Sequence, residues 1–121
     1  MGAALYVKRE TTPSVIPGDE VMFLLRDKGS VSATPRIYIK AIDPGTTWEL
    51  RWGRGPMVDS FTSTYGPFAA MGRGEVMQVG LNNSSDDPVH VVRCLTGRLA
   101  VTVVSPQDVQ MQFRTRGRKS A

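Results

Sequence analysis

Apolar and polar residues take turns at every second position along most of this chain, and the spacing of three or four residues between apolar positions that is typical of a helix is rare. An alternation with period two places successive side chains on opposite faces of a strand, so the pattern predicts β-structure. A single short helical turn is expected at 68–71. The segments that show the alternation are 5–9, 20–26, 36–42, 47–52, 60–65, 75–81, 89–95, 98–104 and 109–114.

Turn-forming residues separate these segments. The fixed φ of proline and the positive φ open to glycine end strands and shape turns. Eight or nine short strands with a turn about every 8–12 residues are typical of an antiparallel β-sandwich, immunoglobulin-like or jelly-roll-like, with a small barrel as the alternative. We therefore expect one domain over residues 1–113 and a basic carboxyl-terminal tail over 114–121.

The strand at 47–52 carries both tryptophans of the chain. Alternation puts Trp48, Leu50 and Trp52 on one face of it. Large rings on one face either fill a core or form an exposed platform on which sugars or bases stack. Because Leu50 lies between the two rings, the core interpretation is favoured, and Trp48 and Trp52 stay candidate stacking residues under the alternative.

Charge is concentrated at the carboxyl end. The formal net charge is +4, and it equals the contribution of the cations that come after Phe113. The rest of the chain is therefore neutral, and we expect the basic character in the tail and not on a face of the fold. Such a cluster without acids is either a solvated end of the chain that aids solubility or a segment that binds phosphates or an acidic partner surface. The tail candidates are Arg114, Arg116, Arg118 and Lys119.

Two Gly-Arg-Gly segments, at 53–55 and 72–74, are weaker candidates for anion binding. Glycines let backbone N–H groups and a guanidinium approach the same phosphate, which makes Arg54 and Arg73 candidate contacts. Neither segment has the spacing of a nucleotide-binding loop. The simpler interpretation is two turns with a solvated arginine, and it weakens if the two loops lie close together.

Residues that could perform catalysis or bind a metal are few. The chain has one histidine and one cysteine, His90 and Cys94, too few for the four nitrogen or sulfur ligands of a structural zinc site. Both alternate with apolar neighbours on the strand at 89–95, so we expect them to be packed against other strands and unreactive. We expect no catalytic residue, metal site, cofactor or small-molecule substrate.

A lone cysteine fits a reducing compartment better than a disulfide-stabilised secreted scaffold. The first residues show no signal-peptide pattern, and no apolar run approaches the roughly 20 residues that cross a bilayer. We expect a cytoplasmic or virion protein that is not secreted through a signal peptide and does not bind a membrane.

Taken together, a neutral β-body without reactive groups favours a non-enzymatic structural or assembly subunit. Such a protein binds neighbouring chains, as a homo-oligomer, in a larger symmetric assembly; phage capsid decoration, cement and connector proteins have this size and composition. The first alternative is a module that binds nucleic acid through its basic tail. The second is a carbohydrate-binding sandwich that uses exposed tryptophan rings.

Overall fold

The computed structural model describes residues 8–25, 35–54, 61–81, 88–105 and 109–115. Within these ranges the chain forms strands and no helix. Eight strands lie close to the predicted positions, whereas the first, expected at 5–9, occupies Lys8–Thr11, with residues 5–7 outside the described ranges. The strands are β1 (Lys8–Thr11), β2 (Asp19–Leu25), β3 (Arg36–Ala41), β4 (Thr47–Arg54), β5 (Phe61–Tyr65), β6 (Val76–Gly80), β7 (Pro88–Thr96), β8 (Leu99–Ser105) and β9 (Val109–Thr115).

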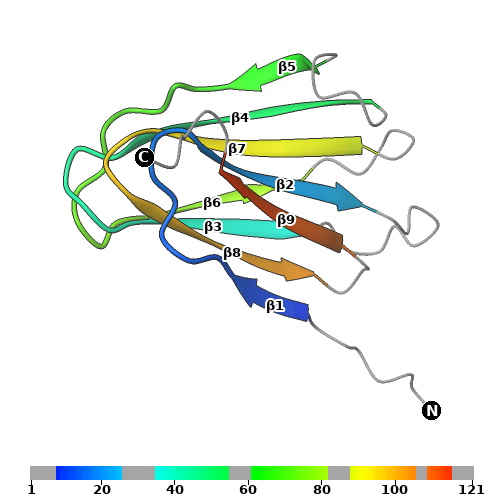
Figure 1. The fold of residues 1–121 in the computed structure, drawn as a ribbon, viewed down its shortest axis with the longest axis horizontal. Coiled ribbons are helices and arrows are strands. Elements are labelled where there is room, and N and C mark those ends of the chain that lie inside the picture. The colour runs from blue at the N-terminus through cyan, green and yellow to red at the C-terminus, as the bar shows by residue number, and fades with distance from the viewer. Residues whose placement is uncertain (1–7, 26–34, 55–60, 82–87, 106–108, 116–121) are drawn as a thin grey trace.

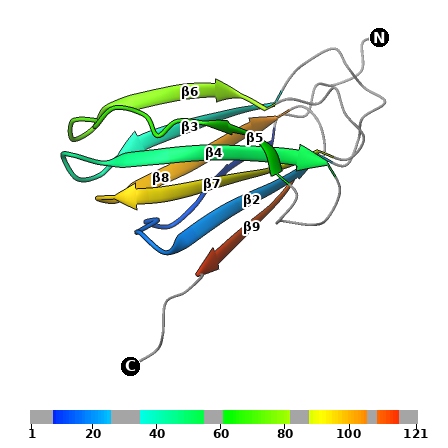
Figure 2. The ribbon, with the colours of Figure 1, turned by 90° about the horizontal axis from the view of Figure 1, so that it is seen from above.

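The strands form two antiparallel sheets that stack face to face (Figure 1). The four-stranded sheet has the order β1-β8-β3-β6, and the five-stranded sheet has the order β5-β4-β7-β2-β9. Figure 2 shows the two layers from a second direction, with β9 as the lowest strand in the view, at the edge of the five-stranded sheet. The predicted antiparallel β-sandwich is confirmed, and the barrel alternative is not.

The core lies between the sheets and is made by the inner residue of each alternation. In β8, Leu99, Val101 and Val103 are fully buried, and the residues between them are half-buried. Burial of each such side chain contributes about 1.5–3 kcal/mol. The core residues are Val15, Val21, Phe23, Ile37, Ile39, Ala41, Trp48, Leu50, Met71, Leu81, Val92, Cys94, Leu99, Val101 and Val103.

The helical turn expected at 68–71 is wrong. The backbone N–H of Phe68 donates to the carbonyl of Trp48 at 3.1 Å, and that of Met71 donates to the carbonyl of Thr46 at 2.9 Å. The segment therefore lies alongside the start of β4 and uses its N–H groups there. The ring of Phe68 stacks on Trp48 with centroids 4.4 Å apart, which favours this extended path over a helix.

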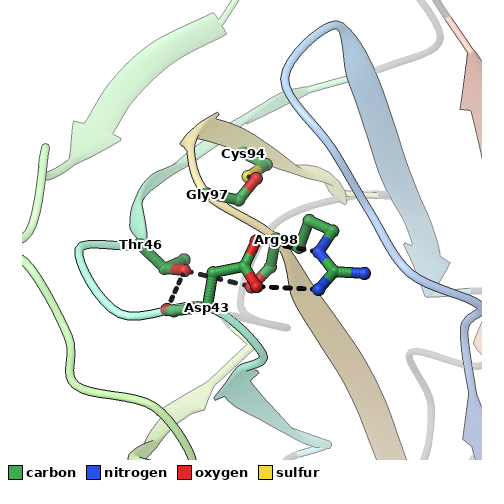
Figure 3. Close-up of polar contacts among 5 residues, drawn as sticks. All are labelled: Asp43, Thr46, Cys94, Gly97 and Arg98. Atoms are coloured by element: carbon green, nitrogen blue, oxygen red, sulfur yellow. Dashed lines mark hydrogen bonds and ion pairs between the residues drawn. The ribbon is translucent and has the colours of Figure 1, made fainter.

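Two crossovers between the sheets meet at one end of the sandwich. The β3–β4 turn leads from the four-stranded to the five-stranded sheet, and the β7–β8 turn leads back. Arg98 binds Asp43 through two hydrogen bonds of 2.7 and 2.8 Å, and the Thr46 hydroxyl donates to the carbonyls of both residues (Figure 3). We call the contact among Asp43, Thr46, Gly97 and Arg98 the corner.

Gly97 is required at the corner for two reasons. Its φ of 77° lies in the left-handed region that residues with a Cβ avoid. A Cβ at this position would also lie 2.9 Å from the Cα of Thr46, closer than a van der Waals contact allows. The lack of a side chain at Gly97 therefore lets the two crossover turns touch.

Candidate interaction surfaces

Each sheet ends in strands whose outer hydrogen-bonding groups pair with no described strand: β1 and β6 in one sheet, β5 and β9 in the other. Proteins usually protect such edges with charges, prolines, bulges or short strands. Edge β1 carries Arg9 and Glu10, and β5 adjoins a register shift between Trp52 and Gly53. Strands β6 and β9 lack acidic residues and proline, and β9 is the longer of the two.

Strand β9 pairs with β2 along its whole length, from Val109 opposite Leu25 to Thr115 opposite Asp19. Its inner residues are apolar: Met111 packs against the core, but Phe113 is 37% exposed. The outer residues Gln110, Gln112 and Arg114 are exposed. The faces are those that the alternation predicts, yet the inner face of β9 is only partly covered.

The basic tail begins inside the sheet. Arg114, its first cation, lies within β9 opposite Glu20. Strand β9 ends at Thr115 on this edge of the sheet. The tail candidates Arg116, Arg118 and Lys119 lie outside the described residues.

The outer face of the five-stranded sheet holds charges of both signs. Arg93 on β7 donates to Glu20 on β2 at 3.0 Å and lies 3.6 Å from Glu49 on β4. Arg51 contacts Glu49 at 3.2 Å. The Glu20 side chain is almost fully buried, and opposite charges in neighbouring strands stabilise the pairing. We call this row of ion-paired residues the balanced face.

The outer face of the four-stranded sheet is different. Arg9 on β1 and Arg36 on β3 both pair with Val104 on β8, so they lie in one row across the sheet. Lys40 lies four residues beyond Arg36 on the same face, and Tyr38 lies between them. Arg9, Arg36 and Lys40 are exposed and Tyr38 is half-buried. We call this surface the cationic face. The net charge of residues 1–113 is zero, so the sum alone does not reveal that cations gather here.

The two Gly-Arg-Gly segments do not form one site. Strand β4 starts beside the Thr46–Met71 bridge and ends with Arg54 opposite Pro88. Its eight residues separate the two ends by about 25 Å. Arg73 is exposed in the turn near the corner, where its charge helps to lower the pKa of Asp43 after the larger effect of the Arg98 hydrogen bond. Gly53 and Arg54 belong to β4 and not to a turn, Gly55 lies outside the described residues, and Arg73 lies in a turn as expected.

The tryptophans do not form a platform together. Trp48 is fully buried between the sheets, as the core interpretation expects. Trp52 is half-buried, and its ring meets Tyr65 at a centroid distance of 5.3 Å and an angle of 74°. Tyr65, which is 53% exposed, is an exposed ring that the sequence interpretation overlooked. Its position at the end of an alternating segment is the signal that marks a ring at a sheet edge.

His90 and Cys94 are packed as expected. His90 is buried between Phe23 and Trp52 in strand register, and burial lowers its pKa to about 4. Burial also raises the pKa of Cys94 to about 11, with smaller contributions from Asp19 and Asp43. An imidazole and a thiol in these states are neutral at pH 7 and poor as base and nucleophile. Within the described ranges no three His, Cys, Asp or Glu residues gather as metal ligands do.

An open hollow of about 450 Å³ lies beside the balanced face. Its charged residues already have partners, since Glu20 is bound by Arg93 and Asp19 accepts the N–H of Ile16 at 3.2 Å. The lining residues are Pro17, Gly18, Asp19, Glu20, Arg93, Cys94 and Leu95.

The described residues include no helix with the length and apolarity needed to cross a membrane. No protein family model, curated protein or solved structure matches this chain.

Proposed function

We propose that this protein is a structural subunit that assembles with further copies of itself through the edge of β9. The observation that supports the proposal is a seven-residue edge strand without acidic residues or proline, whose inner face leaves Phe113 partly exposed. Long edges with few charges pair readily with other chains, and proteins that stay monomeric protect them.

A two-fold axis at Gln112 gives the self-pairing that uses all of β9. In this antiparallel register Gln112 lies opposite itself, Met111 opposite Phe113 of the second copy, and Gln110 opposite Arg114. The apolar pair extends the inner face of the sheet. No cation faces a cation, and the two tails leave at opposite ends of the pair.

The edge of β6, which likewise lacks acidic residues and adjoins no register shift, fits a second copy less well. Strand β6 has five residues, and its neighbour β3 carries Arg36 and Lys40 on the outer face. Self-pairing of β6 would therefore bring two cationic faces into one sheet, where like charges repel.

The test is a matched pair of charge substitutions, Gln112→Lys on β9 and Gln78→Lys on β6, each at the centre of an exposed edge. We expect the unmodified protein to form dimers or larger assemblies in sedimentation velocity, Gln112→Lys to be monomeric and Gln78→Lys to behave like the unmodified protein. A 1:1 mixture of Gln112→Lys and Gln112→Glu restores the dimer because opposite charges then meet at the axis. A protein that stays monomeric at all concentrations, or one that is dissociated by Gln78→Lys alone, contradicts the proposal.

A further inference from the structure

The cationic face consists of the outward residues of four adjacent strands. One row contains Arg9, Val104, Arg36 and Gly80. The next row contains Thr11, Thr102, Tyr38 and Gln78, and a third contains Ala100, Lys40 and Val76. Three side chains on this surface are cations and none is acidic.

The positive charges on this face are not neutralised by neighbours in the described part of the chain. No ion pair there involves Arg9, Arg36 or Lys40, whereas Arg93 and Arg51 on the opposite sheet are both paired. Among the described residues, the acids on or next to β1 and β6 are directed elsewhere: Glu10 lies on the other side of β1, and Glu75 accepts the N–H of Gly72 at 2.7 Å. The face is therefore open to a polyanion.

Tyr38 gives the surface a feature that charge alone does not. It lies two residues from Arg36 and two from Lys40 on the same face, which is about 7 Å in each direction along β3. Thr102 and Gln78 flank it on the neighbouring strands, and the Thr102 hydroxyl lies 2.8 Å from that of Thr11. An aromatic ring with hydrogen-bonding neighbours and a cation on either side matches the stacking platform that binds unpaired bases.

We propose that the cationic face binds single-stranded nucleic acid, with Arg9, Arg36 and Lys40 on phosphates and Tyr38 stacked against a base. This inference is independent of the assembly through β9, because the surface belongs to the other sheet. A single strand fits better than a duplex because bases of a duplex are stacked on one another and cannot reach a ring on a sheet. It also differs from binding by the tail, which starts at β9.

The experiment is a fluorescence-anisotropy titration of the full chain with labelled 20-mers of deoxythymidine and of uridine, at salt concentrations from about 50 to 200 mM. We compare Arg36→Gln/Lys40→Gln with the charge-matched control Arg51→Gln/Arg73→Gln, whose residues lie on the balanced face and in the turn near the corner. The first double variant makes the plot of log affinity against log salt shallower by about 1.4, at about 0.7 for each lost phosphate contact. The control retains the slope of the unmodified protein.

Two further sets of variants distinguish the contributions of base stacking and of the basic tail from that of the cations on the sheet. Tyr38→Leu weakens binding about 5-fold or more, whereas Tyr38→Phe, which keeps the ring, binds like the unmodified protein. A triple Arg116→Gln/Arg118→Gln/Lys119→Gln variant retains most of the affinity. The two oligonucleotides differ in the 2′-hydroxyl and in the methyl group of thymine, so comparing them shows whether either of these groups contributes.

Three results overturn the inference. They are equal losses in the face variant and its control, loss of binding only in the tail variant, and equally tight binding of a polyglutamate of matched charge. The last result would assign the surface to acidic polypeptides. None of these outcomes bears on the oligomeric state, so the inference and the assembly through β9 fail separately.

Discussion

The two outer faces of the sandwich arise from the same alternation of residues, but their charged side chains differ in pairing. Those on one face form ion pairs, and the cations on the other form none with described residues. On the balanced face, Arg93 lies between Glu20 and Glu49, so the charges serve the pairing of β2, β7 and β4. On the cationic face, Arg36 and Lys40 form no ion pair with any described residue. Charges on one face therefore stabilise the fold, whereas those on the other are available for a ligand.

The corner joins the two sheets, so both outer faces are lost if it is disrupted. A substitution there is expected to have the largest effect on the free energy of unfolding. Gly97→Ala forces a Cβ against Thr46 at a left-handed φ, and we expect it to lower the free energy of unfolding by about 3 kcal/mol. Urea denaturation followed by tryptophan fluorescence measures this. The control is Gly74→Ala, which has a similar φ of 80° but open space around it and costs about 1 kcal/mol. Equal losses for the two variants would mean that the close contact with Thr46 is not what matters.

The next effect is a pH dependence that arises beneath the balanced face. His90 has a pKa of about 4 when folded against an ordinary value of 6.5, so between these values the unfolded chain binds a proton that the folded chain does not. The free energy of unfolding is therefore highest above pH 6.5 and falls as the pH approaches 4. At pH 5 it is about 2 kcal/mol below its value at high pH. Unfolding at a series of pH values measures the slope. In His90→Gln this slope should vanish above about pH 5, and its persistence there would assign the effect to other groups.

A smaller effect distinguishes the faces directly. Glu20→Gln removes the charged partner of Arg93 at a nearly buried position, and we expect a loss of about 1–2 kcal/mol, reduced because Arg93 itself is one-third exposed. Glu49 remains within 3.6 Å of Arg93 and limits the damage. Differential scanning calorimetry reports the change. A variant as stable as the unmodified protein would show that the ion pairs of the balanced face do not stabilise the fold.

The smallest expected change completes the comparison. Arg36→Gln on the cationic face should alter the free energy of unfolding by less than about 0.5 kcal/mol, because an exposed cation without a partner contributes little to stability. Urea denaturation under the conditions used for Gly97→Ala measures it. A loss as large as that of Glu20→Gln would mean that Arg36 has a structural partner and would weaken the case for ligand binding.

The sequence predicts most of the strands well because they have an inner row of apolar side chains; β1, which is Lys-Arg-Glu-Thr, has none. Leu99, Val101 and Val103 alternate so regularly that their burial follows from the pattern alone. The failure at 68–71 has a specific reason: the short stretch gains more by placing Phe68 on Trp48 than by forming a helical turn. At 68–71 the packing of Phe68 on Trp48, a tertiary contact, outweighs the local helical preference of the segment.

The surfaces are harder to predict, because they depend on which strands are neighbours. Arg9 and Arg36 lie in one row only because both β1 and β3 pair with β8, and no local pattern contains that pairing. The net charge of a segment is likewise a sum that hides where its charges lie. For the same reason, the separation of Arg54 from Arg73 and the different burial of Trp48 and Trp52 required the fold.

The corner also bears on when this chain can fold during its synthesis. Asp43 and Arg98 are 55 residues apart, and β1, β2 and β3 all take partners from β6 onward. Strand β3 therefore has no partner until β6 has emerged from the ribosome, and β2 and β1 have none until β7 and β8 have. Such non-local pairing is slow and exposes apolar surface. Strand β9 is released last and joins at an edge, so the nascent domain can close its core before that strand arrives.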